Sequence, residues 1–224
     1  MKEAEKHDGE GDQDALVLRV DGNSAGFSYG VKHATISFDN DADATNGTKD
    51  EKQHKIIGGY AMGEVAGAEV AFEFIKRSSD LDDAAAKAAG AKGTGYILAV
   101  GKEINDKLST GISYFSVSDG IKGGGDFAPG EIFDGNVDSS ATADTSVFVV
   151  PVAYSINDKL TANATLITGD VLDKSATEVD LGLEYALGEV TTVSAIYAKA
   201  SGDGAKAALG GDQTNMTIVL ATEF

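Results

Sequence analysis

The sequence predicts an all-β chain whose antiparallel strands build a transmembrane β-barrel. Apolar residues recur with a period of two along most of the chain, which is the period of a strand with one apolar and one polar face. Tight turns alternate with long, acidic, Gly-rich connections, and this asymmetry is typical of membrane barrels. The chain has 28 Gly, 2 Pro and no Cys. It therefore has no disulfide framework and no Cys-based metal site.

The clearest alternation is "EVDLGLEYAL", where Val179, Leu181, Leu183 and Tyr185 share one face and acidic residues share the other. Similar runs predict nine strands in the part of the chain after residue 54. The expected strands are 55–62, 69–76, 95–102, 108–117, 147–154, 160–168, 178–187, 193–200 and 215–224. Their lengths are close to the 9 to 11 residues of a tilted membrane-spanning strand.

The region before residue 39 must supply the remaining strands. Its apolar residues occupy odd positions up to Val31 and even positions from Ala34. Because a slip of one residue exchanges the two faces, we expect a turn or bulge near Lys32–His33. This gives eleven strands, and a further break at "DGNS" would give twelve. Single-chain bacterial barrels have an even number of strands, so eleven suggests that further strands lie upstream.

Two hairpins occur twice in the sequence. "VGKEINDKLSTGIS" is similar to "AYSINDKLTANAT", and "YAMGEVAGAEVAF" is similar to "YALGEVTTVSAIY". We interpret them as an internal hairpin repeat. Tyr60, Tyr154 and Tyr185 each precede a short turn, which suits an aromatic belt at a membrane interface, although Tyr is also common in ordinary strands.

The long connections are expected to be loops. They are "DNDADATNGTKDEKQ", "RSSDLDDAAAKAAGAKGTG", the segment 118–146, "GDVLDKSAT" and "SGDGAKAALGGDQ". One of them contains "LDDAAAKAAGAK", whose Ala content predicts a short helix.

Three stretches resemble the general-diffusion porins of Gram-negative outer membranes, in particular the 16-stranded trimeric type. They are the last strand "MTIVLATEF", the hairpin "DLGLEYALGEVTTVSAIYAKASGDG" and its relative around "GYAMGEVAG". The resemblance implies that residues 15–224 form the barrel domain and correspond to strands six to sixteen. It implies that residues 1–14 are the end of a constriction loop or a disordered lead, so that the narrowest point of the pore lies outside the chain.

The same resemblance implies a homotrimer in outer-membrane lipid and no cofactor. It also implies that the last strand is the signal read by the barrel assembly machinery, through Phe224, Leu220 and Ile218. The first 14 residues contain no signal peptide. We interpret this as a chain that lacks its true N-terminus; the alternative is a soluble cytoplasmic protein.

The polar strand face supplies the candidate pore-lining residues. They are Glu69, Glu73, Glu178, Asp180, Glu184, Thr161 and Asn163. Acidic rings favour cations in a pore, so we expect a mild cation preference. The alternative is a polar wall that is simply wetted.

Other kinds of site find little support. The spacing of Asp39, Asp41 and Asp43 is similar to a calcium loop, but Ala44 and Asp50 stand where that motif needs Gly and Glu. We interpret this stretch as a solvated acidic loop with weak divalent binding at most, and we expect no metal site. No nucleophile constellation is recognisable, so we expect no enzyme. The net charge of −18 argues against nucleic-acid binding.

The sequence therefore predicts an outer-membrane porin for passive diffusion of small polar solutes and ions. The alternative is a non-channel β-barrel or surface β-protein that acts as an adhesion or binding module.

Overall fold

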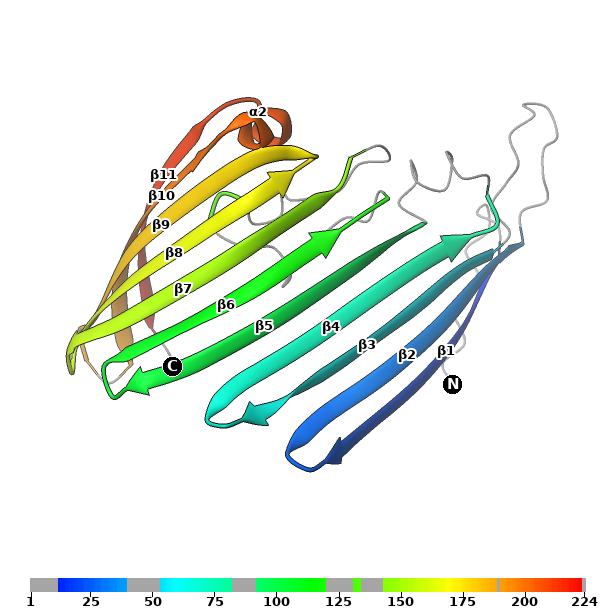
Figure 1. Cartoon of the computed structure of the whole chain (residues 1–224), viewed down its shortest axis with the longest axis horizontal. Coiled ribbons are helices and arrows are strands. Elements are labelled where there is room, and N and C mark those ends of the chain that lie inside the picture. Colours follow the sequence, from blue (N-terminus) through cyan, green and yellow to red (C-terminus); the bar gives the residue numbers. More distant parts are fainter. Residues whose placement is uncertain are drawn as a thin grey trace.

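Eleven antiparallel strands form one sheet in which neighbours in sequence are neighbours in space (Figure 1). The computed structural model describes residues 12–39, 53–81, 92–119, 131–133, 143–188 and 190–222. The strands are β1 (Asp12–Ser24), β2 (Phe27–Asp39), β3 (Gln53–Val65), β4 (Ala68–Ser79), β5 (Gly93–Asn105), β6 (Leu108–Val117), β7 (Thr145–Asn157), β8 (Leu160–Val171), β9 (Lys174–Ala186), β10 (Thr191–Ser201) and β11 (Gln213–Thr222). The expected count of eleven is confirmed, and most strands are longer than the sequence pattern predicts.

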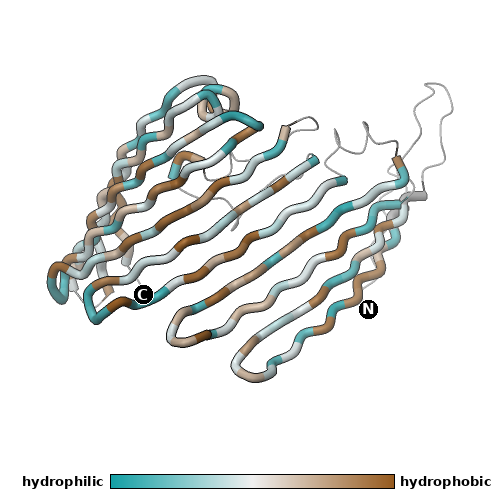
Figure 2. Tube along the Cα trace, in the orientation of Figure 1, coloured by the Kyte–Doolittle hydropathy of each residue, from teal (hydrophilic) through white to brown (hydrophobic). Residues whose placement is uncertain are grey.

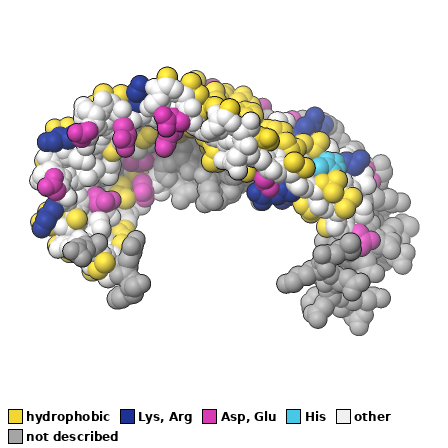
Figure 3. Space-filling model, turned by 90° about the horizontal axis from the view of Figure 1, so that it is seen from below, with side chains coloured by type: hydrophobic (Ala, Val, Ile, Leu, Met, Phe, Trp, Pro, Cys, Tyr) yellow, Lys and Arg dark blue, Asp and Glu magenta, His cyan; other side chains and the backbone are white. Residues whose placement is uncertain are grey.

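The sheet curls into an arch with β1 and β11 at its edges (Figures 1 and 3). Each strand is antiparallel to the next, so β1 and β11 run in the same direction. They are therefore unable to form an antiparallel pair with each other. The arch has an outer, convex face and an inner, concave face.

Three connections are two-residue turns in which both residues have positive φ. The pairs are Ala25 and Gly26 (51° and 82°), Ala66 and Gly67 (52° and 74°), and Leu172 and Asp173 (53° and 58°). This is the type I′ geometry, whose twist matches that of the flanking strands.

The turn or bulge predicted near Lys32–His33 is not there, and the turn between the first two strands lies instead at Ala25–Gly26. β2 pairs with β1 without interruption from Phe27 to Asp39. Val31 lies on the outer face and is 55% exposed, whereas Ala34 lies on the inner face and is 4% exposed. The change of apolar parity therefore marks a change of environment along one strand. Towards the long connections, the inner face becomes apolar and buried.

The "INDKL" repeat folds into the same hairpin twice. The Asn105 side-chain oxygen accepts the backbone N–H groups of Lys107 and Leu108, at 2.9 and 3.1 Å. The second copy places Asn157 in the same role, again at 2.9 and 3.1 Å. The other repeat also forms hairpins, but its turns differ in position: Val65 pairs with Ala68 in one, and Ala186 pairs with Thr192 in the other.

Two connections differ from the expected loops. The stretch "GDVLDKSAT" is the end of β8, a tight turn and the start of β9. A short helix, α2 (Asp203–Leu209), follows β10 and ends at Gly210, which is left-handed and donates its N–H to Lys206 O at 3.0 Å. The helix expected in "LDDAAAKAAGAK" lies almost entirely outside the described residues. No helix in the described ranges is long and apolar enough to cross a membrane.

The outer face is rich in exposed apolar side chains (Figure 3). Along the strands, hydrophobic and hydrophilic residues alternate (Figure 2). Aromatic rings of this face also cover glycines on neighbouring strands. A Cβ built on Gly22 would lie 2.7 Å from the hydroxyl of Tyr29, and one on Gly59 would lie 2.8 Å from the ring of Phe74. Such ring-over-glycine packing fills the gap that glycine leaves in a sheet.

Candidate functional site

The inner face of the arch carries all seven residues predicted to line a pore. Directly paired residues of antiparallel strands share a face. Thr161 pairs with Glu184, and Asn163 pairs with Gly182, two residues from Asp180. Glu73 pairs with Ile97, which packs against the buried inner cluster. Glu69, four residues earlier on β4, therefore has the same orientation.

These residues form two separate groups. Glu69 and Glu73 lie on β4, whereas the other five lie on β8 and β9. At the β1 edge, the inner face also carries positive charge, because Arg19 and Lys32 pair across β1 and β2. The acidic wall of β8 and β9 and this basic edge occupy opposite legs of the arch.

A short piece of the β6–β7 connection lies against the inner wall. The Glu178 carboxylate accepts the backbone N–H of Ile132 on Oε1 at 2.7 Å and that of Phe133 on Oε2 at 2.9 Å. Glu178 has no exposed surface. It faces inward as predicted, but it is covered by the segment 131–133. Hydrogen bonds to a charged acceptor are among the stronger ones in proteins, so this contact fixes the segment on the wall.

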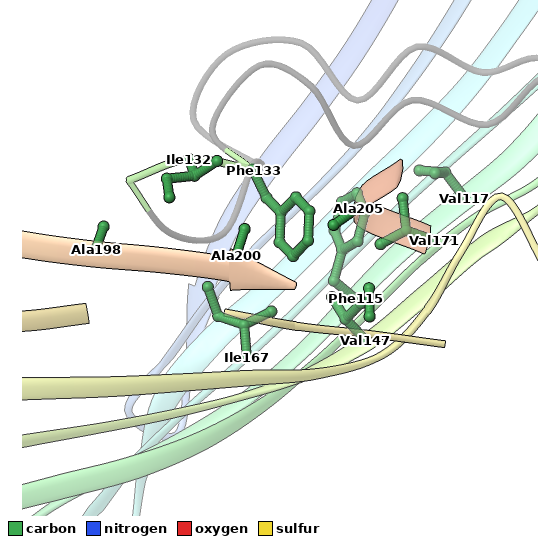
Figure 4. Close-up of a cluster of buried hydrophobic side chains, with 11 residues drawn as sticks. Phe115, Val117, Ile132, Phe133, Val147, Ile167, Val171, Ala198, Ala200 and Ala205 are labelled. Carbon is green, nitrogen blue, oxygen red and sulfur yellow. The ribbon is translucent and has the colours of Figure 1, made fainter. Parts of the chain in front are cut away.

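The side chains of the same segment complete an apolar cluster (Figure 4). Phe133 is fully buried, and Ile132 is 8% exposed. Their buried partners come from β6 to β10 and α2, and they are Phe115, Val117, Val147, Ile167, Val171, Ala176, Ala198, Ala200 and Ala205. The inner face is therefore filled by side chains near the long connections, while it is polar nearer the short turns.

The base of the β6–β7 connection is tied to the turn between β8 and β9. Asp144 accepts the N–H of Asp119 on its side chain at 3.1 Å and the N–H of Asp173 on its backbone oxygen at 2.8 Å. Thr145 Oγ1 accepts the N–H of Leu172 at 3.2 Å. These bonds hold the entry and exit of the connection beside the wall on which Ile132 and Phe133 pack.

The sequence analysis treated this connection as a polar loop and missed the inward segment. The only available signal was the apolar pair Ile132–Phe133 inside a run of Gly and Asp. The resemblance to porins implied that residues 1–14 end a constriction loop and that the narrowest point of the pore lies outside the chain. Residues 1–11 lie outside the described part, and β1 already begins at Asp12.

A pocket of about 390 Å³ opens beside the inward segment. Its lining residues come from β8, β9, β10 and the start of the segment, and they are Glu131, Asn163, Thr165, Asp180, Gly182, Leu183, Glu184, Ser194 and Ile196. Three of them are acidic, and no described residue of the lining is basic. Asp180 is 8% exposed, and its Oδ1 has no hydrogen-bond partner among the described residues.

Tyr60 does not belong to the expected aromatic belt. It pairs with Gly30 on the inner face, and its hydroxyl donates to Asp21 Oδ1 at 3.1 Å. Asp21 also accepts from Arg19 Nε at 2.6 Å. Tyr154 and Tyr185 are on the outer face and are 47% and 43% exposed. The positions before the turns are similar in sequence, but only the register decides the face.

The outer face has an aromatic group that the sequence analysis did not single out. Tyr114 lies 5.8 Å from Tyr96 and 4.8 Å from Phe148, measured between ring centroids. The last strand contributes to the same face through Met216, Ile218 and Leu220, which are 71%, 69% and 66% exposed. Phe224 lies outside the described residues.

No cluster of three or more His, Cys, Asp or Glu in the described ranges is arranged to hold a metal ion. Asp39 is the last residue of β2, and Asp41 and Asp43 lie outside the described part. The calcium-like spacing therefore stays a sequence-based expectation.

The two-faced antiparallel sheet has the fold of outer-membrane β-barrels. The chain is similar to the outer membrane channel DcaP of Acinetobacter baumannii, with 11% sequence identity and a TM-score of 0.53. The match covers 96% of this chain and 64% of DcaP, so the chain spans less than two thirds of that channel.

Two further solved structures match with lower TM-scores. The NanC porin shares 12% identity at a TM-score of 0.45, over 95% of this chain and 94% of the porin. The outer membrane phospholipase A of Escherichia coli shares 10% identity at 0.45, over 94% of this chain and 80% of the phospholipase. No family model and no curated protein matches the chain.

Proposed function

We propose that this chain forms part of the wall of an outer-membrane channel through which small polar solutes and ions diffuse passively. The observation that supports this most directly is the opposition of the two sheet faces. The convex face exposes apolar side chains from each of the eleven strands, and the concave face carries the acids, amides and hydroxyls of β4, β8 and β9. Lipid outside and water inside is the arrangement that stabilises such a sheet in a membrane.

Strand length supports the same function. A strand of 13 residues, such as β3, β5 or β7, is about 43 Å long at 3.3 Å per residue. Tilted by about 45°, it rises about 30 Å, the thickness of the hydrocarbon core of a bilayer. The long connections and the β8–β9 turn would then lie on one side of the membrane, and the other short turns would lie on the opposite side.

The inward segment and the acidic wall would shape the conducting space. Ile132 and Phe133 fill part of the inner face near the long connections, and Asp180 and Glu184 line the space beside them. We propose a mild cation preference for this part of the lumen, because uncompensated carboxylates raise the local concentration of cations. The proposal includes no catalytic step and no cofactor. The homotrimer and the assembly signal at Ile218, Leu220 and Phe224 are proposed from the resemblance to general-diffusion porins.

Single-channel recording of the natural, full-length protein in planar bilayers tests this function. We expect discrete conductance steps, and in a KCl gradient a reversal potential of the sign for cation preference. Glu184→Gln should move that potential towards zero, because it removes one exposed carboxylate from the lumen wall. A protein that stays monodisperse without detergent and adds no conductance would contradict the proposal and favour a surface binding module.

A further inference from the structure

We propose that the pocket beside the inward segment is a binding site for a small organic cation that carries an ammonium or guanidinium group. The site is formed by Asp180 and Glu184 on β9, by Glu131 at the start of the segment, and by Asn163, Thr165 and Ser194 on the neighbouring strands. The inference deepens the proposed channel function, which supplies the route to the site. Binding itself is measurable without transport.

The described residues that line the pocket do not balance its negative charge. Three carboxylates contribute to its lining, and no described lining residue carries a positive charge. Glu178 adds a fourth carboxylate on the same face, under the segment 131–133, and its two oxygens accept the backbone N–H groups of Ile132 and Phe133. Arg19 and Lys32 lie at the β1 edge of the inner face, and Arg77 shares the orientation of Glu73 on β4, so none of the three lies on the strands that line the pocket. Among the described residues no basic side chain lines this wall, so a cation from solution can supply the positive partner.

The environment of Asp180 indicates that the ligand donates hydrogen bonds. Its side chain is 8% exposed, and Oδ1 has no hydrogen-bond partner among the described residues. Buried polar atoms are usually satisfied, and an unsatisfied acceptor costs free energy. An N–H donor that enters the pocket recovers this cost, and a charged donor adds a stronger bond than a neutral one.

The size and lining of the pocket favour an organic cation over a metal ion. Its volume of about 390 Å³ lies in the range of small-molecule sites, and Ile196 provides an apolar wall for carbon atoms. The described acids are not arranged as a metal site. The neutral oxygens of Asn163, Thr165 and Ser194 suit the several N–H groups of one ammonium or guanidinium head.

Calorimetric titration of the detergent-solubilised, full-length protein tests the site. The probes are butylguanidinium and butylammonium, with 1-butanol as the uncharged probe and Ca²⁺ as a compact cation. We expect saturable binding of the two organic cations with one site per chain, and no saturable binding of 1-butanol. Asp180→Asn should raise the dissociation constant about tenfold or more, which is the effect of losing one charge-assisted hydrogen bond.

Matched variants separate the site from a general acidic surface. Glu184→Gln removes an exposed pocket carboxylate and should also weaken binding. Glu69→Gln removes an exposed carboxylate of the same face on β4, outside the pocket, and should leave binding unchanged. Heat-modifiable migration on a gel verifies that each variant is folded, and Glu184→Gln keeps the test decisive if Asp180→Asn does not fold.

Three outcomes would overturn the site. They are equal weakening by Glu69→Gln, displacement of the organic probes by Ca²⁺ at equal ionic strength, and the absence of saturable binding to a protein that conducts ions. The last result would leave the channel function intact. Conversely, saturable binding to a protein without conductance would support the site and contradict the channel.

Discussion

The carboxylate of Glu178 on β9 holds the backbone N–H of Phe133, at 2.9 Å, inside the arch. The two residues are 45 positions apart in sequence. The same carboxylate also binds the N–H of Ile132, so one buried side chain satisfies two consecutive amides. This contact turns part of a Gly-rich connection into a fixed element of the inner wall.

Glu178→Gln should release the segment 131–133. The amide keeps one acceptor oxygen but places an NH₂ group where the second backbone N–H needs an acceptor. We expect a loss of about 1–3 kcal/mol in the free energy of unfolding, which is the cost of an unsatisfied buried group. Faster hydrogen exchange at the amides of Ile132 and Phe133 checks the local effect. Glu184→Gln, six residues away on the same strand, is the control, and equal exchange rates in both variants would contradict the assigned role.

Lysine should distinguish the two faces of the last strand. Ile218 is 69% exposed on the outer face, whereas its neighbour Thr217 pairs with Ile196 and faces inward. We expect Ile218→Lys to cost about 2–4 kcal/mol, as for lysine at the lipid midplane, and Thr217→Lys to cost much less. The measurement is the fraction of folded protein in lipid vesicles, read from heat-modifiable gel migration across a urea series. A larger loss for Thr217→Lys would reverse the assignment of the faces.

Gly204→Ala should displace α2 from its packing against β8 and β9. A Cβ on Gly204 would lie 2.9 Å from Cβ of Ala176 and closer still to the backbone oxygen of Lys174. Because the close neighbour is backbone, we expect overpacking of about 1–3 kcal/mol. Faster hydrogen exchange at the Gly210 amide, which caps α2, reports the shift. Gly211→Ala is the matched control because a Cβ there meets nothing within 4 Å; unchanged exchange in both variants would argue against the tight packing of α2.

Asn105→Ala and Asn157→Ala should destabilise the protein by similar amounts. Each Asn side chain accepts two backbone N–H groups in an equivalent turn. We expect each substitution to lower the free energy of unfolding by about 1 kcal/mol. Denaturant titration of the two variants provides the comparison, with Asp158→Ala in the second turn as the control. A clear loss in one variant and none in the other would show that the two turns are not equivalent.

The strand count and the "INDKL" hairpins could be predicted from sequence because both depend on local order. The alternation of Val179, Leu181 and Leu183 with polar residues identifies a strand wherever it lies in the fold. The side-chain bonds of Asn105 and Asn157 also need only residues within three positions. Where a short turn joins two strands, as between β5 and β6, their antiparallel pairing follows from that turn.

The tertiary structure decided which residues meet inside the arch. Tyr60 and Tyr185 precede their turns in similar sequences, yet register places Tyr60 beside Asp21 on the inner face and leaves Tyr185 outside. Ile132 meets Glu178 across 46 positions, and no local pattern specifies that contact. The physical reason is that the alternation of apolar and polar residues defines the two faces of a strand. It does not show what covers either face. Only the curvature of the sheet and the position of residues 131–133 determine that Glu178 is buried while Glu184 is exposed.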